Sequence, residues 1–147
     1  MILIGYSGHA FVVYGILHAG SKIVNGYCDV IEKDYNPFGL SYFGTENSEA
    51  ALNAIKQNGY FIAVGDNLLR KKIHENLKAK NFTTDNAIHP SAVIDASATL
   101  ANEAVMIAAN VTINPLAAIG TGAICNTGCI IEHECIVGEF AHIGPGA

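Results

Sequence analysis

Residues 107–147 read IAANVTINPLAAIGTGAICNTGCIIEHECIVGEFAHIGPGA and repeat with a period of six. An aliphatic or small apolar residue occupies every sixth position: Ile107, Ile113, Ile119, Cys125, Ile131, Val137 and Ile143. Four positions after each of these stands a small residue or valine: Val111, Ala117, Ala123, Cys129, Cys135, Ala141 and Ala147. A period of six fits neither an α-helix, at 3.6, nor a twisted strand, at 2.0. It is typical of hexapeptide β-helix repeats.

In such a fold each hexapeptide forms one side of a triangular coil, with the aliphatic residue inside and the small residue near a corner. Three hexapeptides, about eighteen residues, close one coil. These coils wind left-handed, against the usual right-handed crossover. The period continues upstream at Ile88/Ala92, Ile94/Ala98 and Leu100/Ala104, but one residue out of phase, so one extra residue must be accommodated near Met106. The sequence therefore predicts a left-handed parallel β-helix of about three coils over residues 88–147.

The first 87 residues alternate between apolar strand-like and helix-like segments. Strands are expected at 1–5, 22–29 and 60–65, with a last short strand at 83–88, and helices at 11–19, 48–58 and 68–80. Ser48 and Asp66 are candidate helix N-caps, and Gly20 and Gly59 candidate helix stops. Alternation of this kind predicts a Rossmann-like α/β domain over residues 1–87, with ligands beyond the carboxyl ends of its parallel strands.

A glycine loop, Gly5-Tyr6-Ser7-Gly8-His9, follows the first strand. Gly5 and Gly8 permit close approach of a ligand, and the following helix offers free N–H groups to a phosphate. The loop does not match the full dinucleotide-binding fingerprint or the Walker phosphate-binding loop. It also does not match the nucleophile elbow of a hydrolase. Two interpretations stay open: a phosphate or nucleotide-sugar site, or a tight turn. Asp29 follows the second strand, and two interpretations of it stay equally open: a contact to the base or ribose of a nucleotide, or an exposed acidic residue in a turn.

The composition and the charge of the chain argue against a nucleic-acid-binding or membrane protein. The chain has 147 residues, half of them hydrophobic, and a formal charge of −5, which argues against nucleic acid and anionic membrane as partners. Residues 104–131 carry no charge, but their asparagines and glycines argue against a membrane helix. The length of the chain and the lack of a secretory pattern favour reduced, cytoplasmic thiols for its four cysteines. We expect Cys125, Cys129 and Cys135 to be buried packing residues rather than zinc ligands.

His133 lies two positions past the inward Ile131, so its side chain is expected to leave the prism. The adjacent Glu134 is placed to orient the imidazole and raise its basicity. A histidine of this kind suits proton abstraction from an amine or hydroxyl at neutral pH. A surface histidine without such context usually has no catalytic role.

A family resemblance extends over nearly the whole chain. It is carried by Gly5-Tyr-Ser-Gly-His9, Ala63-Val-Gly-Asp-Asn67 with Arg70, Ile88-His-Pro90, Ile113-Asn-Pro115 and residues 126–142, of which 131–140 are the most specific. On these stretches the chain resembles the bacterial family of sialic acid O-acetyltransferases and nucleotide-linked 4-amino-sugar N-acetyltransferases.

The resemblance implies an acetyltransferase in which the first domain holds a nucleotide sugar and the β-helix binds acetyl-CoA between subunits of a homotrimer, without a metal. His133 would be the general base in a direct attack on the thioester, with Glu134 as its helper. Asn126 and His142 would line the acetyl-CoA side. The substrate side would comprise Ser7, Gly8, His9, Asp29, Gly65 and Asn67. Val30 stands where the family often has Lys or Asp, so the nucleotide stays open.

Related proteins carry further coils, whereas these 147 residues end inside a repeat. We therefore expect this stretch alone to bind CoA weakly and turn over slowly. Nitrogen or oxygen acetylation and the identity of the sugar stay open. Three alternatives remain. A γ-type carbonic anhydrase is disfavoured because His133 and His142 are nine residues apart. A hexapeptide acyltransferase acting on serine or a free sugar would not need the glycine loop, and the third alternative is a non-catalytic nucleotide-sugar-binding or assembly module.

Overall fold

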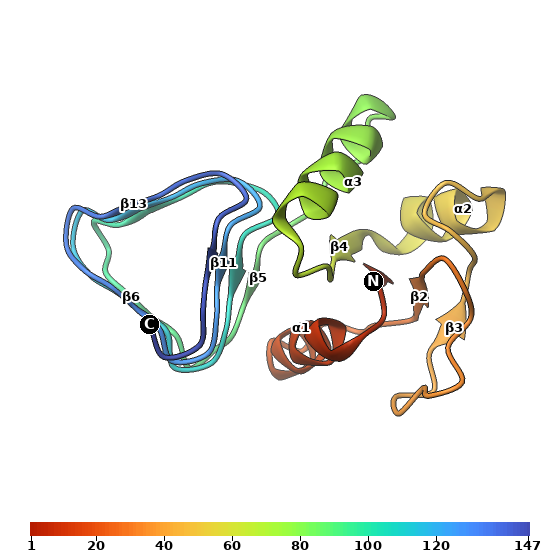
Figure 1. The fold of residues 1–147 in the computed structure, drawn as a ribbon, viewed down its shortest axis with the longest axis horizontal. Coiled ribbons are helices and arrows are strands. Elements are labelled where there is room, and N and C mark those ends of the chain that lie inside the picture. The colour runs from red at the N-terminus through yellow and green to blue at the C-terminus, as the bar shows by residue number, and fades with distance from the viewer.

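The computed structural model describes all residues from 1 to 147. Its N-terminal part is a parallel four-stranded sheet in the order β3-β2-β1-β4, with helices on both faces (Figure 1). The strands are β1 (Ile2–Ile4), β2 (Gly26–Cys28), β3 (Ser41–Tyr42) and β4 (Tyr60–Ile62), and the helices are α1 (Gly8–Ala19), α2 (Glu49–Asn58) and α3 (Asn67–Ala79). No helix is both long and apolar enough to cross a bilayer. The predicted α/β domain is confirmed.

Both faces of this sheet are buried because alternate strand residues point to opposite sides. Leu3 and Phe61 belong to a core shared with α1 and the C-terminal half of the chain. Ile2 and Ile4 belong to a second core, which α2 and α3 complete with residues such as Ile73. The short, wholly apolar strands of the sequence are therefore central strands of a covered parallel sheet.

The predicted helix caps are present. Ser48 Oγ accepts a hydrogen bond from the Ala51 amide at 3.2 Å, and Asp66 Oδ1 accepts one from the Leu69 amide at 2.8 Å. Gly59 ends α2 with φ +69°, in the left-handed region that favours glycine. Helix α1 starts at Gly8, three residues before the predicted start, because the extended Ser7 is its N-cap. Strand β3 was not predicted.

One expected strand is wrong. Of residues 83–88 only Ala87–Ile88 form a strand, β5, and it pairs with β8 (Met106–Ile107) rather than with the first sheet. The hydrogen bond from the Ala87 amide to the Val105 carbonyl, at 2.8 Å, begins this pairing. Ile88 therefore belongs with the hexapeptide repeat, whose period it shares.

The C-terminal part is a left-handed parallel β-helix with a triangular cross-section (Figure 1). Three stacks of two-residue strands form its sides, in the orders β14-β11-β8-β5, β12-β9-β6 and β13-β10-β7. The strands not yet given are β6 (Val93–Ile94), β7 (Thr99–Leu100), β9 (Thr112–Ile113), β10 (Ala118–Ile119), β11 (Ile124–Cys125), β12 (Ile130–Ile131), β13 (Ile136–Val137) and β14 (His142–Ile143). Each repeating aliphatic position is the second residue of a strand, as the period predicts.

The extra residue lies in the corner between β7 and β8, where residues 102–104 form a bend and Ala104 adopts φ +64°. The longer corner brings Glu103 against α3. Its carboxylate pairs with Lys78 and lies 3.7 Å from Nε2 of His74. The break in the repeat thus forms a contact between the β-helix and the N-terminal domain.

The cysteine expectation is correct at two positions and wrong at the third. Cys125 and Cys129 are buried, but Cys135 is exposed. Its counterpart one coil earlier, Ala117, is fully buried under the coil that contains Cys135. Cys135 lies in the last coil and has a neighbouring coil on one side only, so its small side chain remains accessible.

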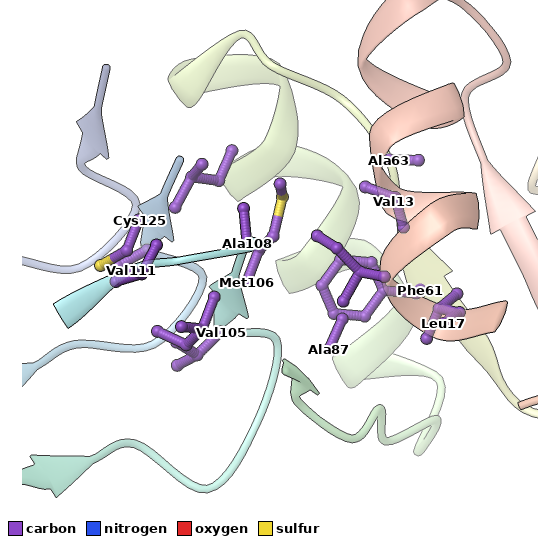
Figure 2. Packing of buried hydrophobic residues seen from close by; sticks show 14 of the residues in the cluster. Val13, Leu17, Phe61, Ala63, Ala87, Val105, Met106, Ala108, Val111 and Cys125 are labelled. Atoms are coloured by element: carbon purple, nitrogen blue, oxygen red, sulfur yellow. The ribbon is translucent and has the colours of Figure 1, made fainter. Parts of the chain in front are cut away.

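The N-terminal domain covers one of the three sides of the prism. Three of the four outward residues of that side, Ala87, Met106 and Ile124, are at most 1% exposed, and the fourth, His142, is half-buried. Figure 2 shows Val13, Leu17 and Phe61 facing Ala87 and Met106 across this contact. The outward residues of the other sides are open to solvent: Ile130 is 55% and Ile136 is 83% exposed.

Arg70 of α3 fastens the two parts together. Its guanidinium, 2% exposed, donates to the Gly122 and Phe140 carbonyls of the β-helix at 2.9 and 2.7 Å. It also donates to the Val64 and Gly65 carbonyls and to Oδ1 of Asn67. Burial lowers the pKa of Arg70 to about 10, so the side chain stays charged at neutral pH. One cation therefore holds α3, the loop after β4 and a corner of the β-helix in a fixed arrangement.

Candidate functional site

The glycine loop passes over the carboxyl ends of β1 and β4. Gly5 has φ +91°, and a Cβ there would lie 2.8 Å from Cγ2 of Val64, so this position requires glycine. The side chain of Ser7 makes no cap hydrogen bond to α1. The first amides of α1, which begins at Gly8, therefore have no capping acceptor from the Ser7 side chain. Such a helix terminus is suited to binding a phosphate group.

Asp29 stabilises this loop. Its carboxylate accepts hydrogen bonds from the amides of Tyr6, at 2.9 Å, and Val30, at 2.7 Å, and pairs with Lys33 at 3.2 Å. Both oxygens are therefore used within the protein. Asp29 holds the glycine loop against the end of β2, and its expected contact with a base or ribose stays a prediction.

A cavity of about 500 Å³ lies between the start of α3 and the β-helix. It is lined by Gly65, Asp66, Asn67, Leu68, Asn126, His142, Gly144 and Pro145. Nδ2 of Asn126 and Nε2 of His142 are 3.1 Å apart. Of the expected site residues, the structure thus brings together Gly65 and Asn67 from one domain with Asn126 and His142 from the other. Asp66, Leu68, Gly144 and Pro145 were not predicted as site residues, although Asp66 lies inside a stretch that carries the family resemblance and the other three follow such stretches within three residues.

His9 connects the glycine loop to this cavity. Its ring lies 5.9 Å from the ring of His142, measured between centroids. Gly65 is also adjacent, since a Cβ at that position would lie 3.8 Å from Cγ of His9. Nε2 of His9 is buried and has no hydrogen-bond partner within the protein.

His133 and Glu134 occupy a different corner of the prism, the turn between β12 and β13. Both side chains are 70% exposed, and Nδ1 of His133 lies 3.1 Å from Oε2 of Glu134. The outward direction expected for His133 is confirmed. The turn is held by a hydrogen bond from the Glu134 amide to the Pro115 carbonyl at 3.0 Å.

In one chain His133 is remote from the glycine loop. The corner between the sides that contain β6 and β13 is opposite the side covered by α1 and α3 (Figure 1). The structure therefore does not bring the predicted base and the predicted substrate site together within a single copy.

Comparisons with known proteins agree with this two-part arrangement. A family model described as the PglD N-terminal domain matches residues 1–77. GDP-perosamine N-acetyltransferase from Caulobacter crescentus, solved with CoA and GDP-perosamine as a histidine-to-alanine variant, is similar at 36% identity and a TM-score of 0.87. The match covers 98% of this chain and 68% of that protein. The chain belongs to the family of nucleotide-linked amino-sugar N-acetyltransferases.

A second structure places the same family in another organism. The acetyltransferase domain of PglB from Neisseria gonorrhoeae, in complex with acetyl coenzyme A, has 28% identity and a TM-score of 0.86. The match covers 99% of this chain and 70% of that one. Both similarities span the N-terminal domain and the β-helix together, so this acetyltransferase family member keeps the arrangement of the two parts.

Two histidines of the acetyltransferase, the half-buried His9 and the buried His74, predict how its stability depends on pH. Burial, with smaller contributions from His142 and Arg70, lowers the pKa of His9 to about 4. Burial also lowers the pKa of His74. An unfolded histidine has a pKa of about 6.5, so between about pH 6.5 and 4 the unfolded chain binds more protons than the folded one. The free energy of unfolding should therefore fall as the pH drops through this window.

Urea unfolding at several values between pH 7.5 and 4.5 measures this dependence. His9→Gln should flatten it, because the glutamine does not titrate. His18→Gln, at an exposed site near the end of α1, should leave it unchanged. A His9→Gln variant with the pH dependence of the parent protein would contradict the assignment.

Proposed function

We propose that this protein transfers the acetyl group of acetyl-CoA to the amino group of a nucleotide-linked sugar. The observation that carries the proposal is the cavity in which Gly65 and Asn67 of the nucleotide-binding domain face Asn126 and His142 of the β-helix. A site made from both domains suits a reaction between a nucleotide sugar and a carrier thioester. The relatives solved with CoA, acetyl-CoA and GDP-perosamine support the same reactants.

In the proposed reaction the sugar amine attacks the thioester carbonyl directly. His133 takes one proton from the attacking nitrogen as the new C–N bond forms. The C–S bond then breaks, and the protonated His133 returns this proton to the leaving sulfur, so that CoA leaves as the thiol and the base is regenerated. Glu134 accepts from Nδ1 of His133, at 3.1 Å, and so presents a basic Nε2 to the substrate. The solved relatives in which one histidine is replaced by alanine or asparagine support a histidine with an important role.

We further propose that the complete site forms between copies in a homotrimer. His133 lies on the corner opposite the N-terminal domain of its own chain, so it can serve only a substrate held by a neighbour. The uncovered sides of the prism carry exposed aliphatic residues, Val93, Ile130 and Ile136, which such an assembly would bury. The free cysteines and the acetyl-CoA substrate favour a cytoplasmic site of action.

The mass of the product tests this function. The protein is incubated with acetyl-CoA and, in separate reactions, with GDP- and UDP-linked 4-amino sugars and with sialic acid. We expect one acetyl group to be added to a nucleotide-linked amino sugar, in an amide that resists mild alkali. Acetylation of sialic acid alone, as an alkali-labile ester, would contradict N-acetyl transfer. Nucleotide-sugar binding without any product would favour the non-catalytic module.

A further inference from the structure

A smaller cavity, of about 180 Å³, opens at the carboxyl ends of β1, β2 and β4. Ile4, Val64, Leu69 and Ile73 give it a mainly apolar lining. All of its residues lie between positions 4 and 73, so the cavity is complete within one chain. An apolar cleft at this edge of a parallel sheet is where a flat ligand group is expected to bind.

The position of this cavity suits the base of a nucleotide. Gly5 lines it and also begins the loop that leads to the N-terminus of α1. A base in the cavity would place its diphosphate over the glycine loop and its sugar toward His9 and Gly65. The base, the diphosphate and the sugar would then lie in this order along the surface, from this cavity to the larger cavity between α3 and the β-helix.

The polar groups of the cavity are acceptors. Its charged side chains are Asp29 and Glu46. Asp29 is already occupied by the Tyr6 and Val30 amides and by Lys33. Glu46 accepts one hydrogen bond, from Nδ2 of Asn47 to Oε1 at 3.0 Å, and its other oxygen has no protein partner.

Asn47 links Glu46 to Asn76 of α3 and to Lys80, which follows α3. Oδ1 of Asn47 accepts from Nδ2 of Asn76 at 2.8 Å and from Lys80, which turns the amide nitrogen of Asn47 toward Glu46. The carboxylate lines the same cavity as Cys28, and burial, with a smaller contribution from Glu46, raises the pKa of the Cys28 thiol to about 12. Glu46 is therefore a held, negatively charged acceptor beside an apolar cleft.

We infer that this cavity is the nucleobase pocket and that Glu46 makes it select guanine. Guanine presents two adjacent donors, N1–H and N2–H₂, which match the two oxygens of a carboxylate. Uracil presents one N–H between two carbonyl oxygens, which a carboxylate repels. The lining side chains offer no strong donor that would pair with those carbonyls. The inference rests on the proposed function, in which the substrate is a nucleotide sugar.

Calorimetric titration of the protein with GDP and with UDP, without acetyl-CoA, tests the inference. We expect GDP to bind at least tenfold more tightly. Glu46→Gln should reduce the affinity for GDP about tenfold and change that for UDP much less, because it removes one acceptor oxygen. The matched control is Glu49→Gln, an exposed carboxylate in the first turn of α2, which should change neither affinity.

Each other outcome has a definite meaning. Equal or tighter binding of UDP overturns the guanine assignment and leaves the proposed function intact. A GDP preference that survives Glu46→Gln overturns the role of Glu46. Binding of neither nucleotide, with a thermal unfolding transition that shows folded protein, overturns the nucleobase pocket. Acetylation of a free amino sugar, tested as an additional reaction in the mass assay, would show that the proposed substrate class is wrong as well.

Discussion

Replacing His133 by alanine is expected to lower kcat for acetyl transfer by about 10²–10⁴-fold, the usual contribution of a general base. The affinity for the nucleotide sugar should remain, because in the proposed complex the N-terminal domain holds the nucleotide and His133 meets only the reacting amino group. Steady-state kinetics and calorimetry with the nucleotide sugar measure the two quantities separately. The folded structure should tolerate the change, since the side chain is 70% exposed.

His18→Ala is the matched control, an exposed histidine near the end of α1 that should keep full activity. Glu134→Gln should give a smaller loss than His133→Ala, because it leaves the base but removes the negative charge 3.1 Å from its Nδ1. A His133→Ala variant that loses less than about tenfold in kcat would exclude the proposed base.

Replacing Arg70 by methionine is expected to cost about 3–5 kcal/mol of the free energy of unfolding. The change leaves the buried carbonyls of Gly122 and Phe140 without a donor, and each such group costs about 1–3 kcal/mol. It also releases the Gly65 carbonyl and the Asn67 side chain, both at the larger cavity. Urea unfolding measures the loss.

Two variants test whether this effect depends on the geometry of the guanidinium. Lys71→Met removes a neighbouring, half-exposed cation of α3 and should cost less than about 1 kcal/mol. Arg70→Lys keeps the charge but cannot reach carbonyls on several sides, so it should recover only part of the stability. If Arg70→Met lowers the free energy of unfolding by no more than Lys71→Met does, Arg70 does not hold the two domains together.

The β-helix could be predicted from the sequence because its signal is repeated. Every turn of the prism needs an inward aliphatic residue at the same place, so Ile107, Ile113 and Ile119 report one geometry several times. The same register gave the outward direction of His133. The same register wrongly predicted that Cys135 is buried. The exposure of this side chain also depends on whether another coil lies beside it, and the six-residue period carries no information about that.

The contacts between distant segments could not be predicted. Strand β5 looks like the end of the α/β domain in the sequence, and only its pairing with β8 assigns it to the β-helix. Arg70 matched a family motif, but its hydrogen bonds to Gly122 and Phe140 span 52 and 70 residues. Glu46 belongs to no sequence motif, and only the folded structure shows that it lies at a cavity formed by the carboxyl ends of three strands.

The central claim is that the base of one copy acts on a substrate held by another, and mixing two inactive variants tests it. His133→Ala removes the base. Gly8→Leu places a side chain over the start of α1, where an added Cβ meets no other atom within 4 Å, so the fold should remain while the loop is blocked.

Each variant alone should be inactive, and trimers formed by co-expression of both should regain activity. With random assembly about a quarter of the sites would combine an intact base with an intact loop. Activity near that fraction of the parent protein is the predicted result. Mixed assemblies with no more activity than the separate variants would show that the base and the substrate belong to the same copy.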